Sequence, residues 1–226
     1  MDYSNYQLDI FDAVKNTQKN ICVEATAGAG MTTTLLSLLE FIPKVKKTIF
    51  LSFSNTIVNE LKSKVPPHIK ASTLHSQGCR MIRKYYKRCR IDNEKYFKLL
   101  VSELDSSEKT KENFKFCGQV SEIMNFARMT LTEPIEKDLS TMCDYYNLDY
   151  KSNVIKKVVQ LLNKPIKTLS VIDFTDMIYL PCNDIRLIDE QYDYVLLDEA
   201  QDLNNAQRLF VERLIKPGGR LIAVGD

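Results

Sequence analysis

The stretch that decides the fold is Ile21-Cys-Val-Glu-Ala-Thr-Ala-Gly-Ala-Gly-Met-Thr-Thr-Thr-Leu-Leu36. It predicts a buried strand, a glycine loop and a helix that opens with three threonines. In such an arrangement the backbone N–H groups of the loop point at one place, and the positive end of the helix dipole adds to them. Gly28 and Gly30 let the backbone approach a phosphate without a Cβ in the way. The stretch predicts a phosphate-binding loop; the alternative is a chance turn rich in Gly and Thr.

One residue departs from the pattern G-x-x-x-x-G-K-[ST], which has a Lys immediately before the hydroxyl residue. Met31 stands at that position, and Ala25 stands where the first Gly would be. Alanine is a mild change. Methionine has a length and flexibility similar to those of lysine but no charge, so the β- and γ-phosphates of a nucleotide would lose their cationic partner. Thr32 stands where the loop hydroxyl would bind Mg²⁺.

The composition sets only broad limits. The chain has 226 residues, a net charge of +2 and 44% hydrophobic residues, which fits one large globular domain, with or without an insertion. The first residues have neither the basic segment nor the apolar core of a signal peptide, and no apolar run is long enough to cross a membrane. We therefore expect a soluble intracellular protein, cytoplasmic or, in a eukaryote, nuclear.

The cysteines suggest no obvious metal site. None of the six forms C-x-x-C, and no Cys/His spacing suits zinc. Four fall in the central third of the chain, which makes an iron–sulfur cluster conceivable. These are Cys79, Cys89, Cys117 and Cys143. Their wide, irregular spacing favours reduced structural thiols instead.

Strand and helix patterns alternate on both sides of a helical middle. The periodicity predicts strands at 47–53, 69–75 (a strand or turn), 193–197 and 220–226, helices at 5–15, 56–64 and 205–215, and a turn at 217–219. This alternation predicts an α/β fold with a parallel sheet flanked by helices.

The middle of the chain reads as helices joined by polar loops. Helices are predicted at 120–129 and 154–162, residues 102–115 are charged and loop-like, and no strand is convincing between 90 and 170. We therefore predict an all-helical subdomain at 86–170 inserted into a sheet domain made of 1–85 and 171–226.

Basic and aromatic residues are interleaved from Arg80 to Lys98. The eight basic residues are Arg80, Arg83, Lys84, Lys87, Arg88, Arg90, Lys95 and Lys98, and the aromatic ones are Tyr85, Tyr86, Tyr96 and Phe97. Such a mixture suits a nucleic-acid surface, where charges contact phosphates and rings stack on bases. It equally suits a solvated amphipathic helix whose rings face its own core. The sequence leaves both interpretations open.

A pair of carboxylates follows the strand at 193–197. Asp198 and Glu199 stand where the carboxyl end of a parallel strand would bring them to the crevice of the phosphate loop. There the first carboxylate holds the Mg²⁺ shell and the second orients and deprotonates water. Acids at a helix N-terminus are the alternative explanation. Together with the loop, the pair predicts a Mg²⁺–nucleotide site.

With these elements in place, the chain resembles the N-terminal part of a superfamily 1 DNA helicase of the UvrD/Rep/PcrA type. The motifs that carry the resemblance are Tyr6-Gln7, Ala25-Thr-Ala-Gly-Ala-Gly-Met-Thr-Thr34, Phe50-Leu-Ser-Phe-Ser-Asn-Thr-Ile-Val-Asn-Glu60, Ser72-Thr-Leu-His-Ser-Gln-Gly78, Asp173-Phe-Thr-Asp-Met177, Leu197-Asp-Glu-Ala-Gln-Asp-Leu203 and Ala223-Val-Gly-Asp226. The resemblance implies a RecA-like P-loop NTPase domain interrupted by a helical subdomain that touches DNA.

The resemblance also implies roles. ATP and Mg²⁺ would be bound by Gln7, which reads the adenine, by the loop residues Ala27, Gly28, Ala29, Gly30, Met31, Thr32 and Thr33, and by Asp198. Glu199 would activate water, and Gln201 would sense the γ-phosphate. Single-stranded or partly duplex DNA would contact Phe53, Asn55, Thr73 and His75. The protein would act as a monomer, with a loading partner protein possible.

Two departures limit these implications. Met31 replaces the Lys of the family, so hydrolysis should be nearly lost; it would be an engineered inactivating change or the natural residue of a pseudoenzyme. The sequence ends inside the last motif, Ala223–Asp226, so the second RecA-like domain that completes the nucleotide site is not in it. The alternative function is a nucleotide-binding regulatory module that docks on a partner without hydrolysis. A small-molecule P-loop kinase fits poorly, because D-E-A-Q-D and T-x-H-x-x-G have no role there.

Overall fold

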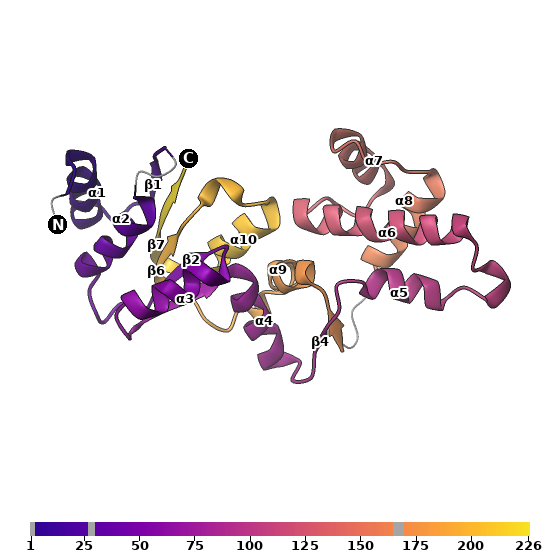
Figure 1. The fold of residues 1–226 in the computed structure, drawn as a ribbon, viewed down its shortest axis with the longest axis horizontal. Helices are drawn as coiled ribbons and strands as arrows, with labels where there is room; N and C mark the ends of the chain where they lie inside the picture. Colours follow the sequence, from indigo (N-terminus) through magenta and orange to yellow (C-terminus); the bar gives the residue numbers. More distant parts are fainter. Residues whose placement is uncertain (1–2, 27–29, 165–169) are drawn as a thin grey trace. The chain divides into compact units, whose positions relative to one another are not determined.

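The computed structural model describes residues 3–26, 30–164 and 170–226. They form two compact units (Figure 1). The sheet unit comprises Met1–Gly78, Ile188–Leu203 and Arg208–Asp226, and the helical unit comprises Cys79–Leu187 and Asn204–Gln207. The predicted division, with an insertion at 86–170, stays a prediction. Within the described part of the chain, no helix is long and apolar enough to cross a membrane.

The predicted α/β fold is confirmed. The sheet unit contains five strands that all pair in parallel. Their order across the sheet is β1 (Ile21–Glu24), β7 (Ile215–Gly225), β6 (Tyr192–Leu197), β2 (Thr48–Ser52) and β3 (Ile69–Thr73). Parallel strands need crossover connections, and the helical patterns between the predicted strands supply them.

Apolar side chains cover the sheet on both faces, which is why the strand segments read as continuous apolar runs. Three helices cover one face: α1 (Asn5–Asn16), α2 (Met31–Leu38) and α3 (Asn55–Lys64). Their core with the sheet includes Phe11, Leu35, Leu38, Phe50, Leu61, Leu196, Ile222 and Val224. The residues that alternate with these along β2 and β6 are also buried, namely Ile49, Leu51, Val195 and Leu197. Phe210 and Leu214 of α10 (Asn205–Leu214) are buried as well.

The predicted turn at 217–219 lies inside β7 instead. The strand pairs with β6 at both ends of this segment, Ile215 opposite Tyr192 and Arg220 opposite Tyr194, so the residues between form an irregular bulge. Gly218 has a φ of 77°, which glycine adopts without strain. The sequence signal for a turn was therefore real, but the chain returns to the same neighbour after it.

The helical unit has two apolar cores. The larger lies among α5 (Lys95–Ser102), α6 (Lys111–Thr130), α7 (Glu136–Tyr145) and α8 (Ser152–Leu162), and includes Val120, Ile123, Leu139 and Val158. The smaller joins the end of α4 (Leu74–Tyr85) to α9 (Phe174–Asn183) through Ile82, Ile172 and Met177. Five cysteines are buried and Cys22 is exposed, and no cluster of metal ligands is found among the described residues.

Two predictions for this unit were wrong. Residues 102–115 are not all loop, because α6 begins at Lys111, where Thr110 caps it by accepting a hydrogen bond from the Asn113 amide. A short parallel pair of strands, β4 (Arg90–Ile91) and β5 (Val171–Ile172), also joins the two ends of the helical segment. Strands of two residues that pair across such a distance carry no periodic signal.

Candidate functional site

The predicted functional residues gather at one edge of the sheet. In a parallel sheet the carboxyl ends of all strands lie on the same side, and ligands bind there in α/β folds. Met31 and Thr32 open the helix that follows β1, Asp198 and Glu199 follow β6, and Asp226 follows β7. Phe53 follows β2, and Thr73 ends β3. The topology therefore brings distant motifs to a common edge.

Thr32 and Asp198 are in direct contact. The Thr32 hydroxyl donates a 2.7 Å hydrogen bond to Oδ2 of Asp198. Asp198 is fully buried, and its Oδ1 has no hydrogen-bond partner among the described residues. Burial raises the pKa of this carboxyl above its usual range, with a further contribution from Glu199, while the bond from Thr32 acts in the opposite direction. A buried carboxylate oxygen without a donor, beside a hydroxyl, suits a hard cation such as Mg²⁺.

The start of α2 offers the backbone groups that a phosphate would need. Gly30 caps the helix with a φ of 76°, in the left-handed region that favours glycine. The backbone N–H groups of the first helical turn have no partner within the helix and point out of its N-terminus. Thr33 is exposed there. The predicted ligands Ala27, Gly28 and Ala29 lie outside the described residues.

Gln7 lines a cavity of about 620 Å³ beside α1 and β1, together with Tyr6, Cys22, Glu24, Met31 and Thr34. The Gln7 side chain has a fixed orientation: its Oε1 accepts from the Ser4 amide at 3.0 Å, and its Nε2 donates to Thr34 Oγ1 at 2.9 Å. Thr34 in turn donates to the Gly30 carbonyl. Thr34 thus links Gln7, the predicted adenine ligand, to Gly30 at the start of α2.

Met31 is half-buried, lines this cavity and contacts the apolar core of the sheet unit. A lysine at the same position could lay its methylene groups along the same surface and hold its ammonium group toward solvent. Nothing in the local packing requires a thioether. The position therefore accepts either residue sterically, and the difference between them is the charge.

Glu199, Gln201 and Asp226 form a short chain of contacts. Gln201 Nε2 donates to Glu199 Oε2 at 2.8 Å, and Gln201 Oε1 accepts from the Asp226 amide at 3.3 Å. Glu199 has a φ of 56°, uncommon for a residue with a side chain and frequent at functional sites. A Cβ on Gly225 would overlap with Gln201 Oε1. This glycine leaves the space through which Gln201 connects the ends of β6 and β7.

The four predicted DNA ligands lie at the carboxyl ends of the neighbouring strands β2 and β3, where Ser52 pairs with Thr73, and in the segments that follow them. Phe53 is half-buried and Asn55 is exposed at the start of α3. The buried Thr73 accepts from the Ser76 amide at 3.1 Å and so caps α4. Burial lowers the pKa of His75, so its ring is neutral at pH 7. This group is displaced along the edge from the Thr32–Asp198 contact.

Sequence reasoning missed the partners that orient the predicted residues. Ser4 and Thr34 position Gln7, and the Asp226 amide positions Gln201. The capping box of Ser4 with Gln7 had a recognisable spacing. The other two contacts join residues that are far apart in the sequence, which no local pattern reveals.

Comparison with known proteins shows the family of the chain. The family model described as UvrD/REP helicase N-terminal domain matches residues 8–226. The ATP-dependent DNA helicase PcrA of Staphylococcus aureus strain Mu50 is 24% identical over an alignment 246 positions long, which covers 95% of this chain and 32% of that protein. PcrA of Staphylococcus epidermidis strain RP62A is 23% identical over 244 residues, with the same coverage. The chain thus spans about a third of the length of these relatives.

Proposed function

The chain belongs to the family of the UvrD/REP helicase N-terminal domain, and from this premise we propose that it is the nucleotide-binding part of an ATP-dependent motor that acts on single-stranded DNA. The observation that carries the proposal is the contact between Thr32 and the buried Asp198, whose second oxygen has no partner among the described residues. It joins two motifs that are distant in the sequence, and both bring oxygen ligands to the same point.

Each residue of the edge would have a separate task. Thr32 and Asp198 would hold Mg²⁺, which supplies charge neutralisation to the phosphates when bound. Gln7 would present its amide to the adenine in the cavity beside β1. Glu199 would accept the proton of the attacking water. Gln201 touches both Glu199 and the backbone of Asp226 and would report the state of the phosphate to the end of β7.

DNA would lie along the same edge on the neighbouring strands. Phe53 and Asn55 follow β2, and Thr73 and His75 mark the end of β3. The exposed amide of Asn55 and the neutral imidazole of His75 can donate and accept hydrogen bonds without carrying a charge. Such groups suit contacts that position a sugar–phosphate backbone. The nucleotide and the DNA would then be bound by adjacent strands of one rigid sheet.

The charge at residue 31 provides the test. We expect Met31→Lys to tighten Mg²⁺–ATP binding by about tenfold to 100-fold, since hydrogen bonds to charged groups contribute roughly 1.5–3 kcal/mol. Met31→Gln, which is polar but uncharged, is the control and should change little. Titration of a fluorescent ATP analogue with and without Mg²⁺ measures both. A chain that binds no nucleotide with any of the three residues would refute the proposal.

Met31 itself favours a second candidate, a regulatory module that binds nucleotide and a partner without hydrolysis. The methionine is partly buried and packs against the apolar core, as a native apolar residue would. This candidate predicts that a longer form of the protein carrying Met31→Lys binds ATP but never hydrolyses it, with or without DNA. Single-stranded-DNA-stimulated hydrolysis by that variant would exclude it.

A further inference from the structure

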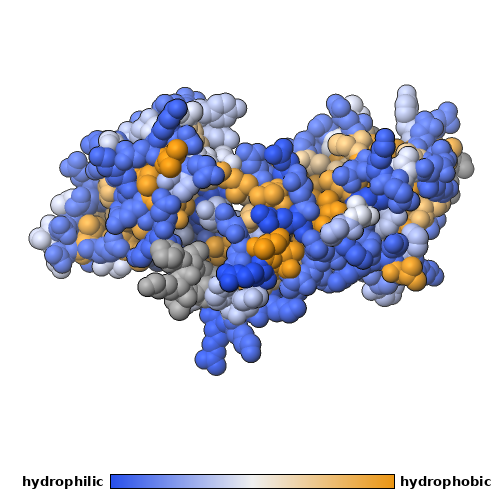
Figure 2. Space-filling model, turned by 180° about the vertical axis from the view of Figure 1, so that it is seen from behind, coloured by the Kyte–Doolittle hydropathy of each residue, from blue (hydrophilic) through white to orange (hydrophobic). Residues whose placement is uncertain are grey.

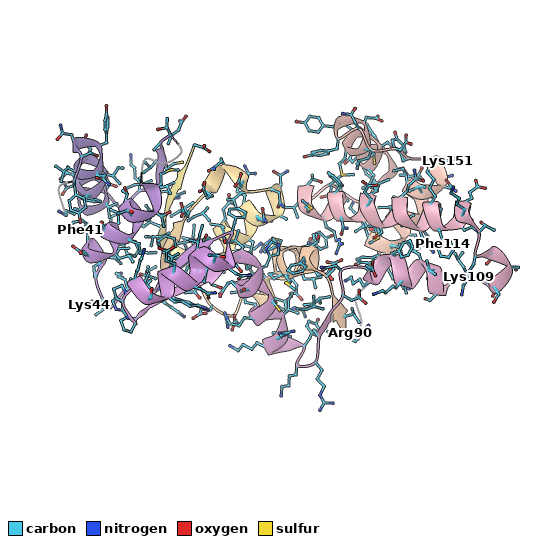
Figure 3. All side chains as sticks on the ribbon, in the orientation of Figure 1. Phe41, Lys44, Arg90, Lys109, Phe114 and Lys151 are labelled. Carbon is cyan, nitrogen blue, oxygen red and sulfur yellow. The ribbon has the colours of Figure 1, made fainter. Side chains whose placement is uncertain are left out.

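A strongly basic turn lies at the end of α4. We define the basic turn as residues 83–90 of the helical unit; from Arg80 to Arg90 the sequence has six basic residues and no acidic one. Arg83, Lys87 and Arg88 are exposed. Figure 3 shows long side chains extending from this turn into solvent near the labelled Arg90, and Figure 2 shows a hydrophilic projection at its lower edge.

Ion pairs divide the basic residues of this region into two groups. Lys95 binds the buried Asp176, and Lys98 binds Asp92 at 2.9 Å. Arg90 lies 3.6 Å from the same Asp92. For Arg83, Lys87 and Arg88, in contrast, no ion pair is found within the described part of the chain. The interpretation of the stretch as a merely solvated face therefore applies to its second half. In the turn, Arg83, Lys87 and Arg88 carry charge with no ion-pair partner in the described part of the chain.

The aromatic residues divide in the same way. Tyr96 lies between two cations, 4.5 Å from Lys95 and 4.7 Å from Arg128 measured to its ring centroid, and Phe97 contacts the larger core of the helical unit. Tyr86 rests on the smaller core. Tyr85, in contrast, is 57% exposed. Its neighbour Tyr86 supports it from one side, with 6.1 Å between the ring centroids.

We propose that the basic turn is a second nucleic-acid contact, in which Arg83, Lys87 and Arg88 contact phosphates of single-stranded DNA and Tyr85 stacks on one of its bases. Three uncompensated cations attract a polyanion, and the exposed ring favours a strand with unpaired bases over a duplex, whose bases are already stacked. The inference rests on the proposed function for its ligand, but it concerns a surface other than the edge of the sheet.

The test compares two sets of charge removals in the same unit. The first is Arg83→Gln, Lys87→Gln and Arg88→Gln in one chain. The matched control removes three exposed lysines around the start of α6 instead: Lys109→Gln, Lys111→Gln and Lys115→Gln. Binding to a fluorescent single-stranded oligonucleotide is measured across a series of salt concentrations. Circular dichroism verifies that both variants are folded.

We expect the first variant to make the slope of log K against log salt less negative by about 2, since each phosphate contact to a single strand contributes about −0.7 to the slope. Binding at 0.1 M salt should weaken on the order of 100-fold. The control should keep nearly the original slope. Equal losses in both variants would mean that only net charge matters, and no loss in the first would mean that the turn is not a contact. Either result overturns the proposal.

The stacking step has its own test. Tyr85→Ala should weaken single-strand binding roughly fivefold to 100-fold without changing the salt slope, and should leave binding to a blunt duplex of the same sequence unchanged. Equal effects on strand and duplex would overturn the single-strand assignment. If the unaltered chain binds no DNA, the proposed function fails; if it binds normally and the turn variants do too, only this inference fails.

Discussion

At the scale of single residues, the buried Asp198 of the candidate site should lower the stability of the fold while it provides a ligand for a cation. Asp198 is fully buried, and one of its oxygens lacks a donor among the described residues. An isolated buried charge is costly, and active sites commonly keep such groups because a ligand satisfies them. We therefore expect the protein to be less stable with Asp198 than with a neutral residue at the same position.

Asp198→Asn should therefore stabilise the protein while removing its response to Mg²⁺. The amide oxygen still accepts from Thr32, but no charge is buried, so we expect the free energy of unfolding to rise by about 1–3 kcal/mol. Mg²⁺ should no longer tighten ATP binding. Urea denaturation and nucleotide titration measure the two effects. Thr32→Val, which leaves the carboxylate without its donor, should have the opposite effect on stability; a less stable Asn variant would contradict the argument.

The residue types at the site could be predicted from the sequence, whereas their mutual orientation could not. The expected positions of Thr32 and Asp198 at the carboxyl ends of parallel strands predicted that they share one crevice, and the 2.7 Å contact between their side chains agrees with that prediction. The left-handed backbone of Glu199 and the contact from Gln201 to the Asp226 amide have no local signal. They arise because β6 and β7 are neighbours in the sheet, and strand order is a property of the fold.

At the scale of elements, a buried ion cluster joins the helices of the helical unit. Arg128 of α6 is 1% exposed and donates to both oxygens of Asp173, at 3.0 and 2.8 Å, and to Asp176 at 2.7 Å. The two aspartates also cap α9 through a capping box. The motif Asp173-Phe-Thr-Asp-Met177 thus has a structural role within the helical unit, because its two carboxylates hold the start of α9 against α6.

Removal of Arg128 should strongly destabilise the helical unit. We expect Arg128→Met to cost about 3–5 kcal/mol, because the buried Asp173 and Asp176 both lose the guanidinium, while Lys95 remains beside Asp176. Arg128→Lys should lower the free energy of unfolding by less than Arg128→Met does. It should still be less stable than the unaltered protein, because an ammonium group cannot donate to both oxygens of Asp173 in a planar fork. Urea denaturation followed by circular dichroism gives the energies, and hydrogen exchange shows whether α6 and α9 open first. A loss below about 1 kcal/mol for Met would show that the cluster is not needed.

A second ion cluster holds the amino ends of the strands and predicts a pH dependence. Burial raises the pKa of Glu190, but hydrogen bonds from Tyr192, Lys47 and Lys70 outweigh it and lower the pKa from 4.5 to about 2. A carboxyl whose pKa is lowered on folding adds stability above its unfolded pKa and loses it below. Its contribution should be present above about pH 4.5 and disappear as the pH falls toward 2.

Glu190→Gln tests this contribution. At pH 7 the variant should unfold with a free energy lower by about 1–2 kcal/mol, a value reduced for solvent screening because the pair with Lys47 is partly exposed. The difference between the two proteins should shrink steadily below about pH 4.5. Glu60→Gln, which alters an exposed pair with Lys64 on α3, is the control and should show almost no pH-dependent difference. A gap that stays constant down to pH 3 would contradict the assignment.

At the scale of the whole molecule, the sheet unit would form one wall of the proposed catalytic site. Gln201, Thr33 and Asp226 are exposed at the carboxyl edge, whereas hydrolysis needs water excluded and charge stabilised on every side of the phosphate. The PcrA relatives are about three times as long as this chain. In motors of this family, as the resemblance implies, a second RecA-like domain closes over the nucleotide, and its opening and closing drives translocation.

We therefore expect binding and turnover to separate. In the 226-residue chain, Met31→Lys should give tight Mg²⁺–ATP binding, but single-stranded DNA should not stimulate hydrolysis. In a longer form with the second domain, the same change should raise the DNA-stimulated rate at least 100-fold, since one missing electrostatic donor costs about 10²–10³ in rate. Steady-state phosphate release measures both, with Glu199→Gln as the inactive control. If single-stranded DNA stimulates hydrolysis by the 226-residue variant, one RecA-like domain completes the site by itself and no second domain is needed.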